Sequence, residues 1–392
     1  MQPVAETPRP LFRRCPRAWT WLLLLAATLL LSGCGRPQTA AAPSAEHLYA
    51  FVSNGASHTV TVVDVYALKA MATIYVGRSP TDIRAHPRRP EIYVAATESN
   101  RIDIIDAARR EVMARVAVGL RPFFIEFAPD GRWAYVANSG SRTVSVIDCE
   151  THRVAATIRV GRGPAQARLT PDGSLLVVTN QGDNTVSLID TDSLEVVATI
   201  GVARLPTALA ILPDGSKAFV AGAESAQVSV VDLRQHVLLS NLAVGKTPID
   251  LVLKPDGGEL FVANFDSHTL TIIDTWRNEV RETLPSGRQP VRLLTNRDGS
   301  LLYLSHFGSD QIALLETATR SLRATVSVGA QPEALALGPA ERILLVTHAA
   351  SNDLAVVRTD EARLVHLVAL GRAPRALALI TLAAASTSAD AR

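Results

Sequence analysis

The feature that most constrains this chain is a repeat of 42 residues that runs without insertion through most of its length. The segment Thr-Val-Ser-Val-Ile-Asp at 143–148 recurs in variant forms, and its final position returns every 42 residues. That position holds Asp64, Asp106, Asp148, Asp190, Asp232 and Asp274, and the phase continues through Glu316 and Arg358. A fixed period of this size is typical of solenoids, propellers and arrays.

A second residue type marks all eight copies independently. Prolines recur at the same 42-residue step, at Pro80, Pro122, Pro164, Pro206, Pro248, Pro290, Pro332 and Pro374. Pro-Asp-Gly at 129–131, 171–173, 213–215 and 255–257 predicts tight turns, because Pro presets φ, Asp bonds its own backbone and Gly closes the turn. Four alternating segments of strand length can be read in each copy, and together they predict one propeller blade.

The two ends of the repeat array indicate how the ring closes. The chain enters at the second strand of a blade, at 48–52, and ends with a lone first strand, from Pro374 to Leu382. We therefore predict an all-β, eight-bladed β-propeller of four-stranded antiparallel blades, closed by pairing the C-terminal strand with the N-terminal blade. This pairing would remove exposed edges. A seven-bladed ring is the fallback.

The repeated segments also resemble a known family. Tyr-Val-Ala-Asn stands at 135–138, Phe-Val-Ala-Asn at 261–264, and Val-Gly-x-x-Pro at 76–80, 118–122 and 160–164. Together with Thr-Val-Ser-Val-Ile-Asp, these segments resemble the YVTN β-propeller repeat family. The resemblance implies a fold rather than an activity, because the family's repeats are structural and its members do different things.

The N-terminus predicts export and a lipid anchor. Four arginines precede an apolar run from Ala18 to Leu31, which is too short for an untilted membrane span and typical of a secretory signal. Leu31-Ser32-Gly33-Cys34 then resembles the lipobox of bacterial lipoproteins, which implies cleavage before Cys34 and lipidation of that residue. An ordinary signal peptide, or a short uncleaved anchor, is the alternative.

These features divide the chain into four predicted parts. Residues 1–33 form a signal peptide, 34–46 a lipidated cysteine and flexible tether, 47–382 the propeller and 383–392 a disordered tail. Gly35 stands where an inner-membrane retention signal usually has Asp. We therefore expect a lipid-anchored protein of the cell envelope, sorted to the outer membrane, on its periplasmic or surface side, if the host has two membranes.

Charge and cysteine content exclude several classes of partner and cross-link. The chain has 39 Lys and Arg against 37 Asp and Glu, and the predicted signal removes four Arg and one Glu, so the remainder is nearly neutral. Nucleic acid is therefore not an expected partner. Without Cys15 and Cys34, only Cys149 remains, so no intrachain disulfide can form. We expect Cys149 to be an isolated surface thiol and the propeller to be monomeric.

Positive charge recurs at one phase of the repeat. The positions two before each phase proline hold Arg78, Leu120, Arg162, Arg204, Lys246, Arg288, Ala330 and Arg372, and Arg121 follows the leucine. Converging guanidinium groups at a channel mouth would suit a multiply anionic ligand. Alternatively, they are solvated turn residues neutralised by neighbours such as Asp82, Glu126, Asp250 and Glu333. Both interpretations stay open.

Histidines and aromatic residues lie near the same predicted face. His306 and His348 share the phase that Asn54, Asn138, Asn180 and Asn264 occupy in other copies. Two imidazoles on adjacent blades could ligate a metal or a heme iron, or they could replace Asn as local turn residues. Phe265, Phe307 and the pair Phe123-Phe124 could stack on a planar ligand or contact a protein, or fill gaps between blades.

The common enzyme motifs are absent from this sequence. Asp82, Glu126 and Asp250 could form a lactonase-like metal site, but their phases differ. Our main interpretation is a lipid-anchored scaffold with no cofactor, which binds a protein, glycan or anionic ligand. The alternative is a tetrapyrrole-binding propeller, for which the blades and basic residues resemble the heme domain of cytochrome cd-type nitrite reductases. That resemblance implies arginines on tetrapyrrole carboxylates and His306 or His348 on iron.

Overall fold

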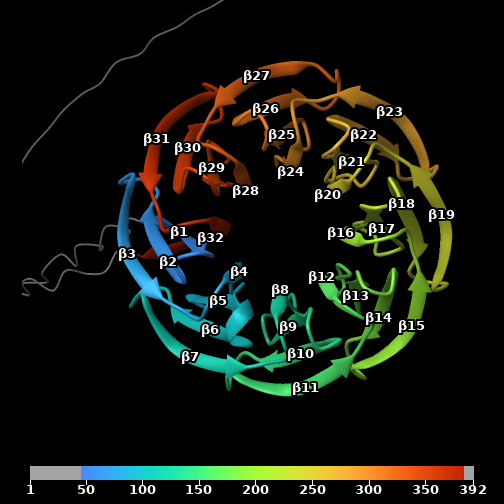
Figure 1. The fold of residues 1–392 in the computed structure, drawn as a ribbon, viewed down its shortest axis with the longest axis horizontal. Helices are drawn as coiled ribbons and strands as arrows, with labels where there is room; N and C mark the ends of the chain where they lie inside the picture. The colour runs from blue at the N-terminus through green and yellow to red at the C-terminus, as the bar shows by residue number, and fades with distance from the viewer. Residues whose placement is uncertain (1–45, 384–392) are drawn as a thin grey trace, which may run out of the picture. The chain divides into compact units, whose positions relative to one another are not determined.

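A ring of eight sheets forms the described part of the protein. The computed structural model describes residues 46–383, and the predicted signal peptide, the lipidation site at Cys34 and most of the predicted tail lie outside this range. Each sheet has four antiparallel strands, and the sheets follow one another around a central axis (Figure 1). The eight-bladed prediction is confirmed. Within residues 46–383 the only helical element is the 3-10 turn η1 (Thr97–Ser99), and no helix there could cross a membrane.

The strands take four positions in each blade, from the axis outward. The innermost strands are β4 (Pro80–Ala85), β8 (Pro122–Phe127), β12 (Pro164–Leu169), β16 (Pro206–Ile211), β20 (Pro248–Leu253), β24 (Pro290–Thr295), β28 (Pro332–Leu337) and β32 (Pro374–Ala383). The second strands are β1 (Glu46–Asn54), β5 (Glu91–Ala96), β9 (Trp133–Asn138), β13 (Leu175–Asn180), β17 (Lys217–Gly222), β21 (Glu259–Asn264), β25 (Leu301–His306) and β29 (Ile343–His348). The third strands are β2 (Thr59–Asp64), β6 (Arg101–Asp106), β10 (Thr143–Asp148), β14 (Thr185–Asp190), β18 (Gln227–Asp232), β22 (Thr269–Asp274), β26 (Gln311–Glu316) and β30 (Asp353–Arg358). The outer strands are β3 (Lys69–Tyr75), β7 (Glu111–Ala117), β11 (Arg153–Arg159), β15 (Glu195–Gly201), β19 (Val237–Ala243), β23 (Glu279–Pro285), β27 (Leu322–Ser327) and β31 (Arg363–Ala369).

The ring closes through the first blade, as the sequence predicts. Blade 1 contains β32, β1, β2 and β3 in that order, and the remaining blades, numbered 2 to 8, each take four consecutive strands. The last strand pairs antiparallel with the first, with Tyr49 opposite Ile380 and Phe51 opposite Ala378. One sheet therefore joins the two ends of the array, and β1 pairs with β32 as the second strand of every other blade pairs with its innermost strand.

The ring has two faces, which we name by their connections. The turn face carries the turns between innermost and second strands and those between third and outer strands. Here the Pro-Asp-Gly prediction is confirmed, since Gly131 has φ +74° and its N–H donates to the Ala128 carbonyl at 2.8 Å. The repeated aspartate is also a turn residue: Asp148 Oδ1 accepts the N–H groups of Glu150 and Thr151 at 2.8 and 2.9 Å. The loop face carries the remaining connections.

The hydrophobic core lies between neighbouring blades rather than inside any one blade. Tyr93 and Ile104 of blade 2, for example, pack in one buried cluster with Ile125 and Val136 of blade 3. Cys149 belongs to the same cluster and is fully buried, so the expectation of a surface thiol is wrong. Its position after β10 turns the side chain toward blade 2, and burial raises the pKa of its thiol to about 11.

Candidate functional site on the loop face

Side-chain hydrogen bonds anchor the loops that lead into the innermost strands. The N–H of Leu120 donates to Ser141 Oγ at 3.0 Å, and the N–H of Arg121, which has a left-handed φ of +54°, donates to Asn100 Oδ1 at 2.9 Å. The first of these bonds recurs around the ring: the N–H groups of Arg78, Arg204, Lys246, Ala330 and Arg372 donate to Ser99, Ser225, Ser267, Ser351 and Ser57. Asp183 replaces the serine for Arg162. In seven of the eight loops the backbone is therefore held by this bond, and the side chain of the cation, except for that of Arg162, is not part of it.

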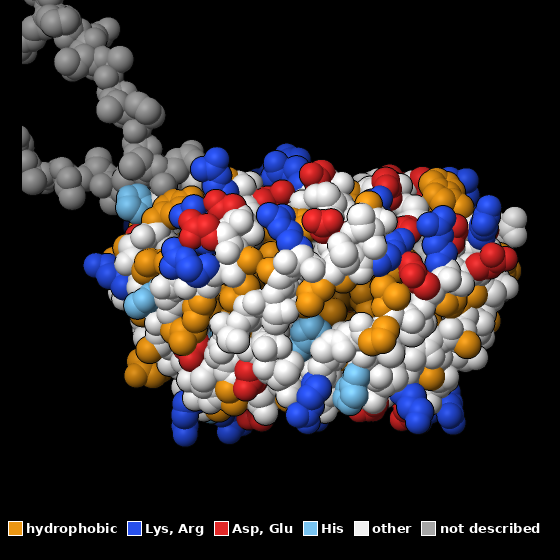
Figure 2. All heavy atoms as spheres, turned by 90° about the horizontal axis from the view of Figure 1, so that it is seen from above, with side chains coloured by type: hydrophobic (Ala, Val, Ile, Leu, Met, Phe, Trp, Pro, Cys, Tyr) orange, Lys and Arg blue, Asp and Glu red, His pale blue; other side chains and the backbone are white. Residues whose placement is uncertain are grey.

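These anchored loops present a ring of cationic side chains. The basic ring consists of Arg78, Arg121, Arg162, Arg204, Lys246, Arg288 and Arg372, and all seven are exposed. Arg162 pairs with Asp183 at 2.5 Å, whereas the other six form no ion pair within residues 46–383. Figure 2 shows Lys and Arg side chains projecting from both ends of the ring, with acidic side chains interspersed among them.

The carboxylates that could have neutralised the basic ring have other partners. Asp82 pairs with Arg84 at 3.2 Å, Glu126 with Arg168 at 3.0 Å and Glu333 with Arg375 at 3.1 Å. Asp250 lies 3.9 Å from Arg292. These arginines belong to the innermost strands. The four carboxylates therefore interact with strand residues and not with the cations of the loops. The acidic groups that do share the loops are exposed residues such as Glu98 and Glu224.

The proposed lactonase-like set is not a site in this structure. The carboxylates of Asp82, Glu126 and Asp250 accept the N–H groups of Ile125, Leu169 and Leu293 at 3.0, 3.4 and 2.9 Å, each in the next blade. They therefore bridge neighbouring innermost strands on blades 2, 3 and 6. Burial raises the pKa of Asp250. Within the described residues no group of three His, Cys, Asp or Glu is arranged to hold a metal ion.

The innermost strands carry a charged cluster that the sequence reasoning did not identify. The guanidinium groups of Arg84 and Arg168 lie 4.6 and 4.9 Å from the centre of the Phe124 ring. Burial alone would lower the pKa of Arg84, but the carboxylates of Asp82 and Glu126 reverse this effect and raise it. The sequence does contain a signal for this cluster, because the fourth residue after the repeated proline is charged in three consecutive copies and apolar in the others. That position holds Arg84, Glu126, Arg168, Ala210, Val252, Leu294, Ala336 and Ala378.

His306 and His348, which share one position of the repeat, are buried and form hydrogen bonds that hold the loops; we call them the histidine fasteners. His306 Nε2 accepts the Gly287 N–H at 2.9 Å and lies 3.0 Å from Ser286 Oγ. His348 Nε2 accepts the Gly329 N–H at 3.2 Å. Burial lowers the pKa of His306 to about 4. A nitrogen that accepts a backbone N–H has no lone pair left for a metal, so these bonds support the local turn role.

Asparagines hold the same position in other blades by a different pattern. Asn138 Nδ2 donates to Thr143 Oγ1 at 3.1 Å and to Ser145 Oγ at 3.0 Å. Its Oδ1 is buried without a hydrogen-bond partner, as are those of Asn54, Asn180 and Asn264. In blade 7 the two hydroxyl positions hold Gln311 and Ala313, so an imidazole that bonds the preceding loop replaces the amide.

Aromatic side chains stand on opposite sides of the loop face. Phe123 of blade 3 is 44% exposed, and Leu120 beside it is 53% exposed. Phe265 and Phe307, at the ends of β21 and β25, have ring centres 6.1 Å apart. Blades 3 and 7 are four positions apart in a ring of eight, so Phe123 and Phe307 lie across the axis from each other. Phe124, by contrast, is buried between blades.

The fold places this chain in the class of eight-bladed β-propellers, and a sequence comparison narrows the class. The model of the cytochrome D1 heme domain family matches residues 97–293, which is half of the chain. The chain belongs to this family. No curated protein matches its sequence. The YVTN resemblance stays a prediction, because the matching model is a different one.

Solved structures show the same fold at low sequence identity. Dihydro-heme d1 dehydrogenase NirN, in complex with DHE, matches with a TM-score of 0.71 at 16% identity, covering 84% of this chain and 74% of that one. Hydrazine synthase of Kuenenia stuttgartiensis matches with a TM-score of 0.59 at 23% identity, covering 71% and 95%. A functionally unknown protein from Desulfotomaculum acetoxidans DSM 771 gives 0.59 at 16%, covering 84% and 98%. At these identities the likeness shows the fold alone.

Proposed function

We propose that this chain binds a tetrapyrrole on its loop face and holds the macrocycle by its carboxylates. The observation that carries the proposal is the basic ring, of which six members have no ion-pair partner within the described residues and most stand on anchored loops. The family match supports a tetrapyrrole as the anionic ligand rather than a protein or glycan, and so favours our alternative interpretation over the scaffold.

The chemistry of the donor set fits a flat polycarboxylate. A guanidinium group binds a carboxylate through two parallel N–H···O bonds, and anchored loops reduce the entropy lost on binding. Phe123 and Phe307 offer apolar contacts on opposite sides of the axis. A planar macrocycle lying over the axis would present its carboxylates outward to the basic ring.

His306 and His348, the two candidate iron ligands in the sequence, are not placed to ligate iron. The Nε2 atoms of His306 and His348 already accept backbone N–H groups. A bound tetrapyrrole would supply a conjugated ring and its metal, while this chain would bind and orient it.

The proposed cellular setting follows from the N-terminal sequence. We propose that Cys34 carries lipid and that the propeller is held at a membrane of the cell envelope through it. Labelling with a fatty-acid analogue, in the wild type and in Cys34→Ala, tests this part independently of binding. We also propose that the propeller is monomeric.

The binding proposal is tested by titrating the full chain with uroporphyrin, whose eight carboxylates make it a strong probe, and following absorption and fluorescence. The triple variant Arg204→Gln, Lys246→Gln, Arg288→Gln is expected to weaken binding at least tenfold, because three charge-assisted contacts are lost.

The control is a triple variant on the turn face, Arg132→Gln, Arg234→Gln, Arg297→Gln. It removes the same charge, so long-range attraction falls equally in both variants. Equal weakening in both variants would contradict a site at the basic ring. The absorption spectrum of the protein purified from its own membranes completes the test. A featureless spectrum, together with no binding of uroporphyrin, returns the loop face to the scaffold interpretation.

A further inference from the structure

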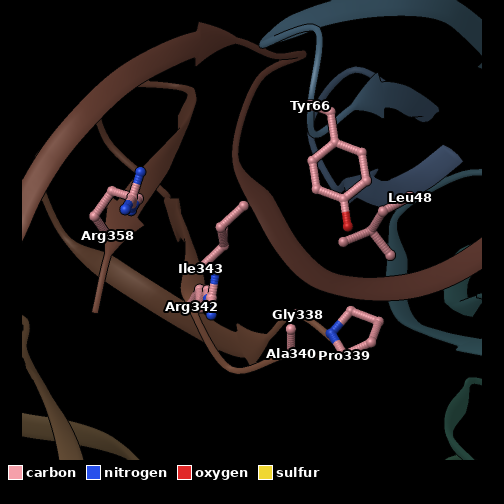
Figure 3. A pocket seen from close by; sticks show the side chains of 8 residues that line it. All are labelled: Leu48, Tyr66, Gly338, Pro339, Ala340, Arg342, Ile343 and Arg358. Atoms are coloured by element: carbon pink, nitrogen blue, oxygen red, sulfur yellow. The ribbon is translucent and has the colours of Figure 1, made fainter. Parts of the chain in front are cut away.

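A hollow lies on the turn face where the ring closes. Its volume is about 320 Å³, and it is lined by residues of blade 8 and blade 1, including Leu48, Tyr66, Pro339, Arg342, Ile343 and Arg358 (Figure 3). We call it the seam pocket. It is on the opposite face from the basic ring, so nothing proposed above accounts for it.

Within the described residues, the seam pocket lies at the one place in the ring where the innermost and second strands of a blade are not joined by a turn. In blades 3 to 7 the turn between the innermost and second strands rests on the turn of the preceding blade. A Cβ built on Gly173 or Gly257 would lie 3.2 or 2.9 Å from Pro129 or Pro213, for example. In blade 1 the innermost strand β32 and the second strand β1 are the two ends of the array and are not joined by a turn. Among residues 46–383 the blade 8 turn at 338–340 therefore has no such turn against it.

The floor of the seam pocket is apolar. Leu48 takes the phase that holds Arg132, Ser174 or Ser216 in other copies, and its side chain is 2% exposed. Ile343 and Pro339 continue this surface from blade 8. Tyr66 is 59% exposed, and its hydroxyl is directed toward Leu48 (Figure 3). A pocket with an apolar floor and few polar groups is the usual form of a small-molecule site.

Two arginines supply charge on the blade 8 side. Arg358 forms ion pairs with Asp360 at 3.1 Å and with Glu361 at 3.3 Å, so its charge is balanced by these carboxylates. Arg342 is exposed and forms no ion pair among residues 46–383. The seam pocket thus combines an apolar floor, one phenol and one uncompensated guanidinium. This combination fits a ligand with an apolar body and a single anionic end.

We propose that the seam pocket binds a small amphiphilic carboxylate, with its apolar body against Leu48, Pro339 and Ile343 and its carboxylate on Arg342. The planar guanidinium fork matches a carboxylate bidentately. The volume is at the lower end of the range for ligand sites, so the body must be short. This binding is independent of the tetrapyrrole proposal because the two sites are on opposite faces.

Octanoate is the probe, and its binding to the full chain is followed by ligand-observed NMR and calorimetry. We expect one saturable site, with affinity about tenfold lower in Arg342→Gln because a charge-assisted bond is lost. Octan-1-ol, which has the same body without the charge, should bind the wild type and Arg342→Gln equally. Tyr66→Ala should weaken octanoate binding by removing one wall.

The repeat supplies matched controls at the same phases. Arg132 corresponds to Arg342, and Trp276 corresponds to Tyr66. Arg132→Gln and Trp276→Ala should leave octanoate binding unchanged. Absence of saturable binding, which includes the case where the chain's own ends fill the hollow, overturns the proposal, as does equal weakening by Arg132→Gln. Uroporphyrin titration of the same samples reports the loop face separately, so failure of one proposal is distinguishable from failure of the other.

Discussion

The loop face and the turn face are built from the same repeat, yet their charged side chains have different partners. On the turn face, Glu91 lies 3.2 Å from His152, and Glu259 pairs with Arg320, each across to the next blade. Lys217 donates to Asn278 at 2.9 Å between the same two phases. On the loop face, Arg204 and Lys246 have no such partner among the described residues. The difference separates charge that holds blades together from charge that remains available to a ligand.

The cause of this difference lies in how the connections are anchored. Turn-face contacts run from the first residue of a second strand to a turn residue 61 positions later, so side chains do the anchoring. Loop-face cations are anchored by their backbone N–H groups, through serines such as Ser225 and Ser267. A side chain whose backbone is already held can point into solvent without cost to the fold. This comparison makes three predictions about stability.

The largest expected effect is on the turn face. Glu259 accepts from Arg281 at 3.0 Å and from Arg320, and it is 9% exposed. Glu259→Ala removes two charge-assisted hydrogen bonds, although Arg281 keeps Asp274 and Arg320 keeps Glu282 as partners. We expect a loss of about 2 to 3 kcal/mol in the free energy of unfolding. Urea denaturation measures it. Glu224→Ala, at an exposed loop-face position, should change stability by less than about 0.5 kcal/mol. Equal losses would remove the distinction between the faces.

The second prediction concerns the histidine fasteners of the loop face. The pKa of His306 is near 4 in the folded protein, against 6.5 for the free side chain. The unfolded chain therefore gains a proton as pH falls below 6.5, whereas the folded chain does so only near pH 4. Titration of His306 therefore leaves the free energy of unfolding nearly unchanged above about pH 7. As pH falls from 7 to 5, this free energy decreases by about 2 kcal/mol.

His306→Asn tests this prediction through the slope of stability against pH. The variant should lose that part of the slope, since an amide does not titrate. Its absolute stability is not the readout, because Gln311 and Ala313 do not offer the hydroxyls that Asn264 bonds in blade 6. A slope identical to that of the wild type would mean that His306 is not held neutral by burial.

The smallest expected effect compares two serines of the same phase. Ser141 Oγ accepts the Leu120 N–H at 3.0 Å, so Ser141→Ala should cost about 1 kcal/mol. Ser309 Oγ is buried without a hydrogen-bond partner, so Ser309→Ala should cost little. Thermal denaturation of both variants measures the difference. A larger loss in Ser309→Ala would contradict backbone anchoring as the basis of the loop-face geometry.

The sequence predicted the fold well because residues that recur at each period mark where strands begin and where turns lie. The prolines mark the starts of the innermost strands, and the aspartates mark the turns after the third strands. It predicted the side chains less well. Cys149 reads as a turn residue and is buried, because the next position after β10 faces the neighbouring blade. Asp82, Glu126 and Asp250 read as candidate ligands, but they bond backbone N–H groups of the next blade.

By itself the sequence determined the number of blades, the four strands in each and the pairing of the last strand with the first. These properties follow from period, turn chemistry and alternation, which are local and repeat in phase. Only the tertiary structure decided that His306 and His348 are fasteners, that Arg84 and Arg168 enclose Phe124 and that a pocket lies at the seam. Each of these depends on contacts between loops or blades, or on the place where a turn is absent. A repeat pattern describes one blade at a time and therefore does not contain this information.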